Sequence, residues 1–118
     1  TLGGVKPLLV VDAANVVGSV PDGWWRDRAA AAERLRDALR GRDEEVVLVV
    51  EGKARNVSSV DDVRVVAAPG EGDDTIVDVV RTEGADRAVT VVTADRELRQ
   101  RVRALGAEVA GPTSVPRR

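Results

Sequence analysis

The sequence contains no cysteine and no histidine among its 118 residues. The lack of cysteine excludes disulfide bonds, thiolate metal sites and a cysteine nucleophile. The lack of histidine removes the commonest general base, and with it every Ser-His-Asp arrangement. Any catalysis by this chain would therefore depend on carboxylates, hydroxyls, amides, lysine or arginine.

Long apolar runs are missing as well. No run approaches the roughly 18 residues of a membrane-spanning helix, and no signal peptide is visible. We therefore expect a cytoplasmic protein with no membrane partner. The length fits one domain that can bury its own hydrophobic core, and nothing in the sequence predicts an oligomeric state.

The sequence has few aromatic residues and a small net charge. Trp24 and Trp25 are the only aromatic residues, and 18 basic residues nearly balance 20 acidic ones, for a net charge of −2. Nucleic-acid-binding proteins are usually basic. This balance therefore argues against nucleic-acid binding, unless the basic and acidic residues lie in separate parts of the chain. The arginines do cluster, in residues 26–42 and 96–103, although two solvated helix faces would also explain this. We expect one tryptophan to pack on the core, and the other could stack on a base.

The sequence does contain alternating strand and helix patterns. Buried strands are expected within residues 7–15, 44–52, 63–72 and 87–95, with a short one at 108–111, and helices within 26–41, 73–85 and 95–107. Strands that are apolar on both faces and alternate with helices indicate a mainly parallel sheet covered on both sides. We predict a single Rossmann-like three-layer α/β/α domain over residues 8–110. An N-terminal extension at 1–7 and a disordered tail at 111–118 would flank it.

Acidic residues follow the expected strands. Asp12 closes the first strand, Glu51 closes the second, and Asp95 follows the run AVTVV after Thr93. Parallel strands all end at one edge of their sheet, called here the carboxyl edge, where ligands of such folds bind. We therefore expect these acids to meet at the carboxyl edge.

The segment GEGDDTIVDVV adds acids at the start of an expected helix. Asp73 lies three and four residues before the apolar positions Ile76 and Val77, so it heads the buried face of that helix. Asp74 lies at the margin of this face. In the last expected helix, Asp95 heads an apolar face in the same way.

Each acid taken singly has a structural explanation. Aspartate is a preferred N-cap, which would explain Asp73 or Asp95, and Glu51 could face water at a strand end. Several carboxylates at one edge nevertheless repel one another unless a cation lies among them. No lysine or arginine occupies the two strand ends themselves, although Arg96 directly follows Asp95. Oxygen ligands without histidine or cysteine favour Mg²⁺ or Mn²⁺ over zinc.

The motifs VVDAAN, GEGDDTIVD and TADREL, in this order, resemble the NYN branch of the PIN-like nucleases, and within it the YacP-like proteins. The resemblance covers residues 8–109. It implies a PIN-like, Rossmann-type fold, Mg²⁺ or Mn²⁺ held by carboxylates, and mostly ribonuclease activity. The catalytic and metal-site acids that it implies are Asp12, Asp73 or Asp74, and Asp95, with Glu51 where relatives often have aspartate.

The resemblance also implies roles for polar residues beside these acids. Asn15 matches an asparagine that shapes the site just after the first strand, and Thr93 matches a serine or threonine before the last acid. Arg96 could contact a phosphate, although an exposed ion pair would explain it equally well. We assign Asn15, Thr93 and Arg96 to substrate binding.

Together these features predict a metal-dependent ribonuclease of the endoribonuclease type, acting on single-stranded RNA. The ion would make a bound water more acidic, orient the phosphate and stabilise charge in the transition state. Two alternatives stay open. One is an inactive PIN-like module that binds RNA, a ribosome or a protein partner. The other is a small phosphohydrolase acting on nucleotides, which would need a closed pocket where a nuclease needs an open groove.

Overall fold

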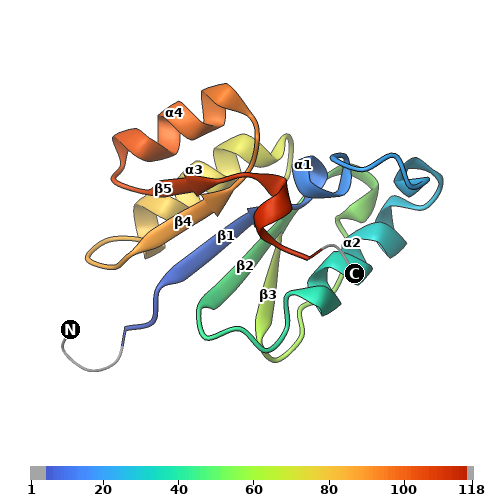
Figure 1. Ribbon diagram of the computed structural model, residues 1–118, viewed down its shortest axis with the longest axis horizontal. Helices are drawn as coiled ribbons and strands as arrows, with labels where there is room; N and C mark the ends of the chain where they lie inside the picture. Colours follow the sequence, from blue (N-terminus) through green and yellow to red (C-terminus); the bar gives the residue numbers. More distant parts are fainter. Residues whose placement is uncertain (1–4, 117–118) are drawn as a thin grey trace.

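Five parallel strands form the centre of the structure, a computed structural model that describes residues 5–116 (Figure 1). The strands are β1 (Leu8–Asp12), β2 (Glu45–Val50), β3 (Val63–Ala67), β4 (Val89–Val92) and β5 (Glu108–Ala110). The helices are α1 (Ala13–Val17), α2 (Arg28–Ala38), α3 (Gly72–Glu83) and α4 (Arg96–Ala104). Short 3-10 turns occur at η1 (Trp24–Arg26), η2 (Gly52–Ala54) and η3 (Pro112–Ser114).

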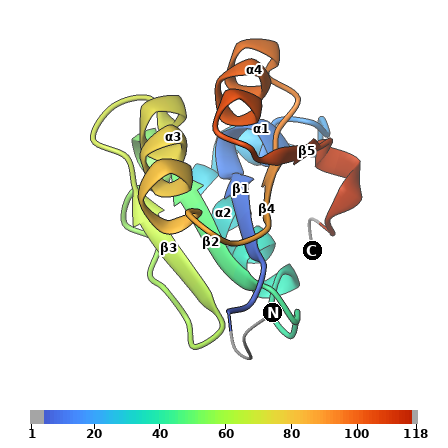
Figure 2. The same cartoon turned by 90° about the vertical axis from the view of Figure 1, so that its left-hand side faces the viewer.

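The sheet has the strand order β3-β2-β1-β4-β5, and every neighbouring pair is parallel. Helices α3 and α4 lie side by side on one face (Figure 2). Helices α1 and α2 cover the other face. The expected three-layer α/β/α fold with a parallel sheet is therefore confirmed.

Two hydrophobic cores, one on each face, follow from the two-residue period of the strands. In β1, Leu9 and Val11 face the core under α1 and α2, whereas Leu8 and Val10 face the core under α3 and α4. The same alternation runs through β2. The central strands are thus buried on both faces, which explains their uninterrupted apolar sequences.

The helices bury most of the faces that their spacing predicted, whereas Leu105, expected on the apolar face headed by Asp95, is 43% exposed just after α4. In α3, Ile76, Val77 and Val80 are buried, and in α4 Leu98 and Val102 are buried. Both helices end near a glycine, as expected. None of the helices within residues 5–116 has the length and apolar content needed to cross a bilayer.

Two segments differ from expectation. Residues 13–17 form the short helix α1, whereas the sequence predicts a first strand within residues 7–15 and no element at 16–17. The expected disordered tail forms η3, and Val115 is buried in the core under α1 and α2. This apolar contact orders the segment, while residues 117–118 of the expected tail and 1–4 of the expected extension lie outside the described residues.

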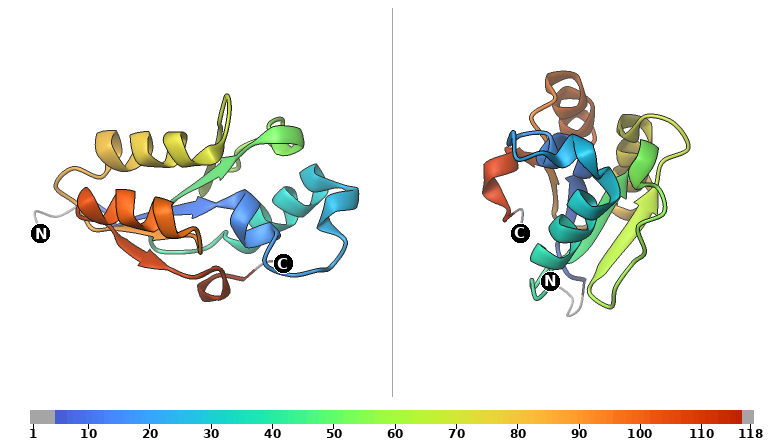
Figure 3. Two further views of the ribbon diagram at one scale, coloured as in Figure 1. Left: turned by 90° about the horizontal axis from the view of Figure 1, so that it is seen from above. Right: turned by 90° about the vertical axis from the view of Figure 1, so that its right-hand side faces the viewer.

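The strand order reverses between β1 and β4. The chain runs outward from β1 to β2 and β3, then returns across α3 to β4 and β5 on the other side. Such a switch point leaves a crevice outside the carboxyl edge, where ligands of open α/β sheets bind. Figure 3 (right) views the molecule from the side on which β1 ends and α1 begins.

Candidate functional site

Asp12 lies at this switch point, at the junction of β1 and α1. It is the N-cap of α1, and its Oδ1 atom accepts a hydrogen bond from the backbone N–H of Asn15 at 3.4 Å. Its Oδ2 atom accepts a hydrogen bond from the Thr93 hydroxyl, beyond the end of β4, at 2.9 Å. Both carboxylate oxygens are therefore held by groups that directly follow the two strands at the switch point, one in α1 and one beyond β4.

The surroundings of Asp12 oppose its ionisation. Burial is the largest cause and raises its pKa to about 6, from a usual value of 3.8. The hydrogen bonds from Thr93 and the Asn15 amide lower the pKa, whereas the negative charges of Glu51 and Asp73 raise it further. These two carboxylates thus lie near enough to Asp12 for their negative charge to raise its pKa.

Thr93 and Asn15 tie the two loops of the switch point together. Thr93 is fully buried, and its hydroxyl also accepts a hydrogen bond from the Asp95 amide at 3.1 Å. The Asn15 Oδ1 atom accepts a hydrogen bond from the Ala94 amide at 2.8 Å. The Thr93 hydroxyl thus positions Asp12 and the loop after β4, and the Asn15 side chain holds that loop through its Oδ1 atom.

Glu51 joins the ends of β2 and α3. Its Oε2 atom accepts a hydrogen bond from the Gly72 amide, the first residue of α3. The N-cap residue of α3, Glu71, makes no capping hydrogen bond with its own side chain. Glu51, which follows a distant strand, therefore accepts a hydrogen bond from a backbone amide that has no partner within the first turn of α3. A Cβ at Gly72 would lie only 3.1 Å from the same Oε2 atom. No local sequence signal marks this contact.

The three remaining acids are placed differently from one another. Asp73 is half-buried in the first turn of α3 and is not its N-cap. Asp95 is exposed, and its Oδ1 atom caps α4 by accepting from the Leu98 amide at 2.9 Å. Asp74 is exposed and forms an ion pair with Arg101 of α4 at 3.0 Å. The capping explanation thus applies to Asp95 and does not apply to Asp73.

Basic side chains from α4 lie close to the acids of the carboxyl edge, although no lysine or arginine occupies the strand ends themselves. Arg101 pairs with Asp74, and the Arg99 Nε atom donates to the Thr93 carbonyl at 2.8 Å. Both arginines come from α4, seven and nine residues beyond the end of β4 at Val92, so the sequence next to the strand did not reveal them. Arg96 is exposed at the first position of α4 and has no ion pair or hydrogen bond within residues 5–116.

The acids do not form a ready-made metal cage. Among residues 5–116, no group of three or more acidic side chains is close enough together to hold a metal ion. Mg²⁺, however, usually takes one or two carboxylates and completes its shell with water and substrate phosphate. Asp12, with Glu51 and Asp73 close by, fits this donor chemistry, since all the candidate ligand atoms are oxygens.

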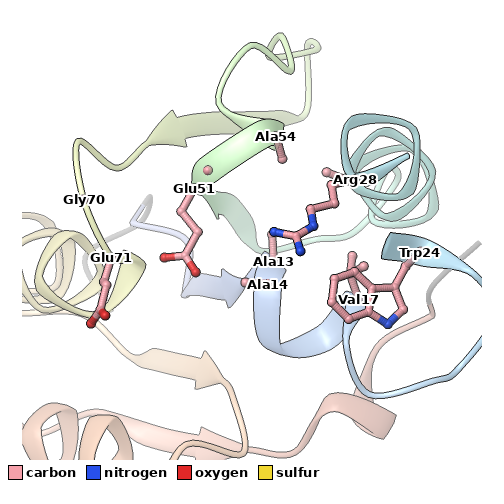
Figure 4. A pocket seen from close by; sticks show the side chains of 11 residues that line it. Ala13, Ala14, Val17, Trp24, Arg28, Glu51, Ala54, Gly70 and Glu71 are labelled. Carbon is pink, nitrogen blue, oxygen red and sulfur yellow. The ribbon is translucent and has the colours of Figure 1, made fainter. Parts of the chain in front are cut away.

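A pocket of about 400 Å³ opens beside these acids (Figure 4). Glu51 and Glu71 lie on one side of it, and Trp24 and Arg28 lie on the other. The floor is apolar and made of small side chains, Ala13, Ala14, Val17, Ala32 and Ala54. Sequence reasoning did not predict this pocket, because its walls come from segments that are up to 58 residues apart (Ala13 to Glu71).

Comparison with known proteins gives a structural match only. No family model matches the sequence, and no curated protein matches it. A crystal structure of a mutant of Rae1 (YacP) from Bacillus subtilis superposes with a TM-score of 0.62 and 16% sequence identity, covering 90% of this chain and 69% of that chain. The two chains share a fold, and it is the fold of the YacP branch that the sequence motifs resemble.

Proposed function

We propose that this chain is a metal-dependent phosphodiester hydrolase that cleaves single-stranded RNA internally. The proposal depends above all on Asp12, a carboxyl group at the β1/β4 switch point whose pKa is raised to about 6 by burial and by Glu51 and Asp73. Strongly shifted carboxyl groups in a cleft are typical of functional sites. RNA as the substrate class is supported by the motif resemblance to NYN nucleases and by the fold shared with YacP.

Asp12 is the central candidate ligand for Mg²⁺ or Mn²⁺, with Glu51 or Asp73 as a second carboxylate and water or substrate phosphate completing the shell. When bound, such an ion supplies Lewis-acid chemistry, which polarises a phosphoryl oxygen and makes water more acidic. Asp95 is a further candidate through its Oδ2 atom, which takes no part in the cap of α4. We give Asp74 a lesser role, because Arg101 already neutralises it.

The polar residues around Asp12 have supporting roles in this proposal. Thr93 and Asn15 hold the carboxylate and the loop after β4 in place through their hydrogen bonds. Arg96, exposed beside Asp95, would contact a phosphate of the RNA strand. No histidine is required for this chemistry, so the composition is compatible with it.

The experiment compares purified wild type with Asp12→Asn on a labelled single-stranded RNA in Mn²⁺ and in EDTA. We expect cleavage by the wild type, its loss in EDTA, and a rate at least about 100-fold lower in Asp12→Asn. Asp78→Asn is the matched control, because Asp78 is exposed on α3 and paired with Arg81 away from the site. Equal cleavage by wild type and Asp12→Asn would reveal a contaminating nuclease and contradict the proposal.

Two observations favour alternatives. The lack of a three-acid group within residues 5–116 favours a PIN-like module that binds RNA or a ribosome without cleaving it. RNA binding without cleavage by any variant would support that reading. The size of the pocket beside Glu51 favours a hydrolase of free nucleotides, which would release phosphate from nucleotides in the same assay series.

A further inference from the structure

The pocket beside the acids has the dimensions of a small-molecule site. Its volume of about 400 Å³ lies within the range of roughly 300–1,000 Å³ typical of ligand pockets. Its walls share Glu51 with the candidate active site, and Ala13 and Ala14 directly follow Asp12. A group bound in the pocket would therefore lie next to the carboxyl edge.

The apolar part of the pocket suits a flat ring. Ala13, Ala14, Val17 and Ala54 are small, and the indole of Trp24 lies beside Val17 (Figure 4). Small side chains leave width for a planar group and provide no hydrogen bonds of their own. A nucleobase has this shape and an apolar face.

Arg28 supplies a positive charge on the same pocket. Its guanidinium carbon lies 5.4 Å from the centre of the Trp24 ring, and Figure 4 shows the group pointing across the pocket toward the side of Glu51. Within residues 5–116 it has no carboxylate partner, whereas Arg36 of the same helix pairs with Asp37, and Arg40, just beyond the helix, pairs with Asp62. A guanidinium without a carboxylate partner of its own is a ready ligand for phosphate, here with Glu51 and Glu71 on the opposite side of the pocket.

Trp25 extends this surface outside the pocket. It is 50% exposed and contacts Trp24 edge-to-face, with ring centres 5.9 Å apart and an angle of 87°. The Arg26 guanidinium lies 5.8 Å from the Trp25 ring centre. Aromatic side chains next to arginines form the stacking surfaces of proteins that bind single-stranded nucleic acid.

We infer that the pocket between α1, η1 and Glu51 binds one nucleotide of a single RNA strand. Arg28 contacts its phosphate, the base lies against the alanine-lined wall, and the neighbouring base stacks on Trp25. The strand would pass from Trp25 through the pocket to Asp12. This inference rests on the proposed action on RNA and names the subsite that holds the substrate.

The test measures binding without catalysis. A fluorescently labelled six-nucleotide single-stranded RNA is titrated in EDTA with wild type, Arg28→Ala, Arg28→Lys and Arg34→Ala, and anisotropy is recorded. Arg34 is the matched control, because it is exposed on the same helix and lines no part of the pocket. We expect binding about tenfold weaker in Arg28→Ala, a partial loss in Arg28→Lys, and less than about a twofold change in Arg34→Ala.

Tryptophan fluorescence gives a second readout, since the chain has only two tryptophans. In Trp25→Leu, Trp24 is the sole emitter, and RNA in the pocket should change its emission. A nucleoside monophosphate should do so far more weakly than the hexamer, and equal affinity for both would overturn the RNA-strand assignment in favour of free nucleotides.

The outcomes separate this inference from the proposed function. If RNA binding depends on Arg28 but no variant cleaves RNA, the subsite stands and the proposed hydrolysis fails. If RNA is cleaved but Arg28→Ala and Arg34→Ala bind it equally well, the subsite is wrong and hydrolysis stands. Failure of the wild type to bind the hexamer also overturns the subsite.

Discussion

The carboxyl group of Asp12 is influenced in two directions by its surroundings. Burial and the charges of Glu51 and Asp73 raise its pKa, while hydrogen bonds from Thr93 and the Asn15 amide lower it. The net result is a pKa of about 6, so the group is mostly ionised at neutral pH at a cost to stability. A bound cation would remove that cost, which links the electrostatics of this residue to the proposed metal site.

We predict that Asp12→Asn stabilises the metal-free protein above about pH 6. A carboxyl group whose pKa is higher in the folded chain contributes stability that is complete below its unfolded pKa and is lost as the pH rises through its folded pKa. The rise from 3.8 to about 6 corresponds to about 3 kcal/mol at most. Urea unfolding in EDTA at acid and neutral pH measures the difference between the two proteins. Equal stability of wild type and mutant at both would contradict the raised pKa.

Thr93→Val should destabilise the protein by about 1–3 kcal/mol. Valine keeps the volume of threonine but leaves the Asp12 Oδ2 atom and the Asp95 amide without their hydrogen-bond partner. The pKa of Asp12 should also rise further, because this hydrogen bond lowers it. Unfolding curves and an NMR titration of the Asp12 carboxyl carbon test both effects. Thr93→Ser is the control, since it keeps the hydroxyl, and equal pKa values in the two variants would contradict the assigned role.

At the scale of elements, a hydrogen bond from a distant strand end fixes the start of α3, and close packing against β4 limits its end. Glu51 of the β2 end accepts from the Gly72 amide at its start. At its end, the Gly84 amide donates to the Val80 carbonyl, and the chain turns close to β4. The helix therefore carries Asp73 to a defined place beside Asp12 only when β2 and β4 are in position.

We predict that Gly84→Ala lowers the free energy of unfolding by about 1–3 kcal/mol. A Cβ at this position would lie 2.5 Å from the Val80 carbonyl oxygen and 2.7 Å from the Val89 Cγ2 atom, so the end of α3 or β4 must shift. Thermal and urea unfolding measure the loss. Gly70→Ala is the matched control, because no atom of residues 5–116 lies within 4 Å of a Cβ there, and its change should stay within about 0.5 kcal/mol. Similar effects in both variants would argue against crowding as the cause.

For the whole molecule, the strand order decides where the acids meet. Because β1 lies between β2 and β4, the ends of these strands bring Asp12, Glu51 and the loop after β4 to one crevice. An ion bound there would contact the folded chain and not the unfolded one. Metal binding should therefore be visible in global stability.

We predict that millimolar Mn²⁺ raises the melting temperature of the wild type by several degrees. Binding to the folded state alone adds about 2.7 kcal/mol when the metal concentration is 100 times Kd. Asp12→Asn and Asp73→Asn should lose most of this shift in a thermal melt, whereas Asp78→Asn, on the exposed side of α3, should retain it. A wild-type melting curve unchanged by Mn²⁺ would contradict the proposed metal site.

Much of the fold could be predicted from the sequence because it depends on local periodicity. Short continuous apolar runs between turn signals, such as residues 46–50, predict strands that are buried on both faces. Ile76, Val77 and Val80 recur at helical spacing and predict the buried face of a helix. An aspartate at the end of the first strand also lies at the carboxyl edge in any parallel sheet. Periodicity did not predict α1 or the burial of Val115, since five residues or one apolar side chain give too weak a pattern.

The sequence by itself therefore determined the class of fold, the strands and longer helices, and the edge at which Asp12, Glu51 and Asp95 lie. Only the tertiary structure decided which acids act on one another and which are occupied elsewhere. The bond from Gly72 to Glu51 spans 21 residues, the pair of Arg101 with Asp74 spans 27, and the bond from Thr93 to Asp12 spans 81. Such contacts depend on strand order and helix packing, because local patterns specify which face of an element is buried and not which distant side chain meets it.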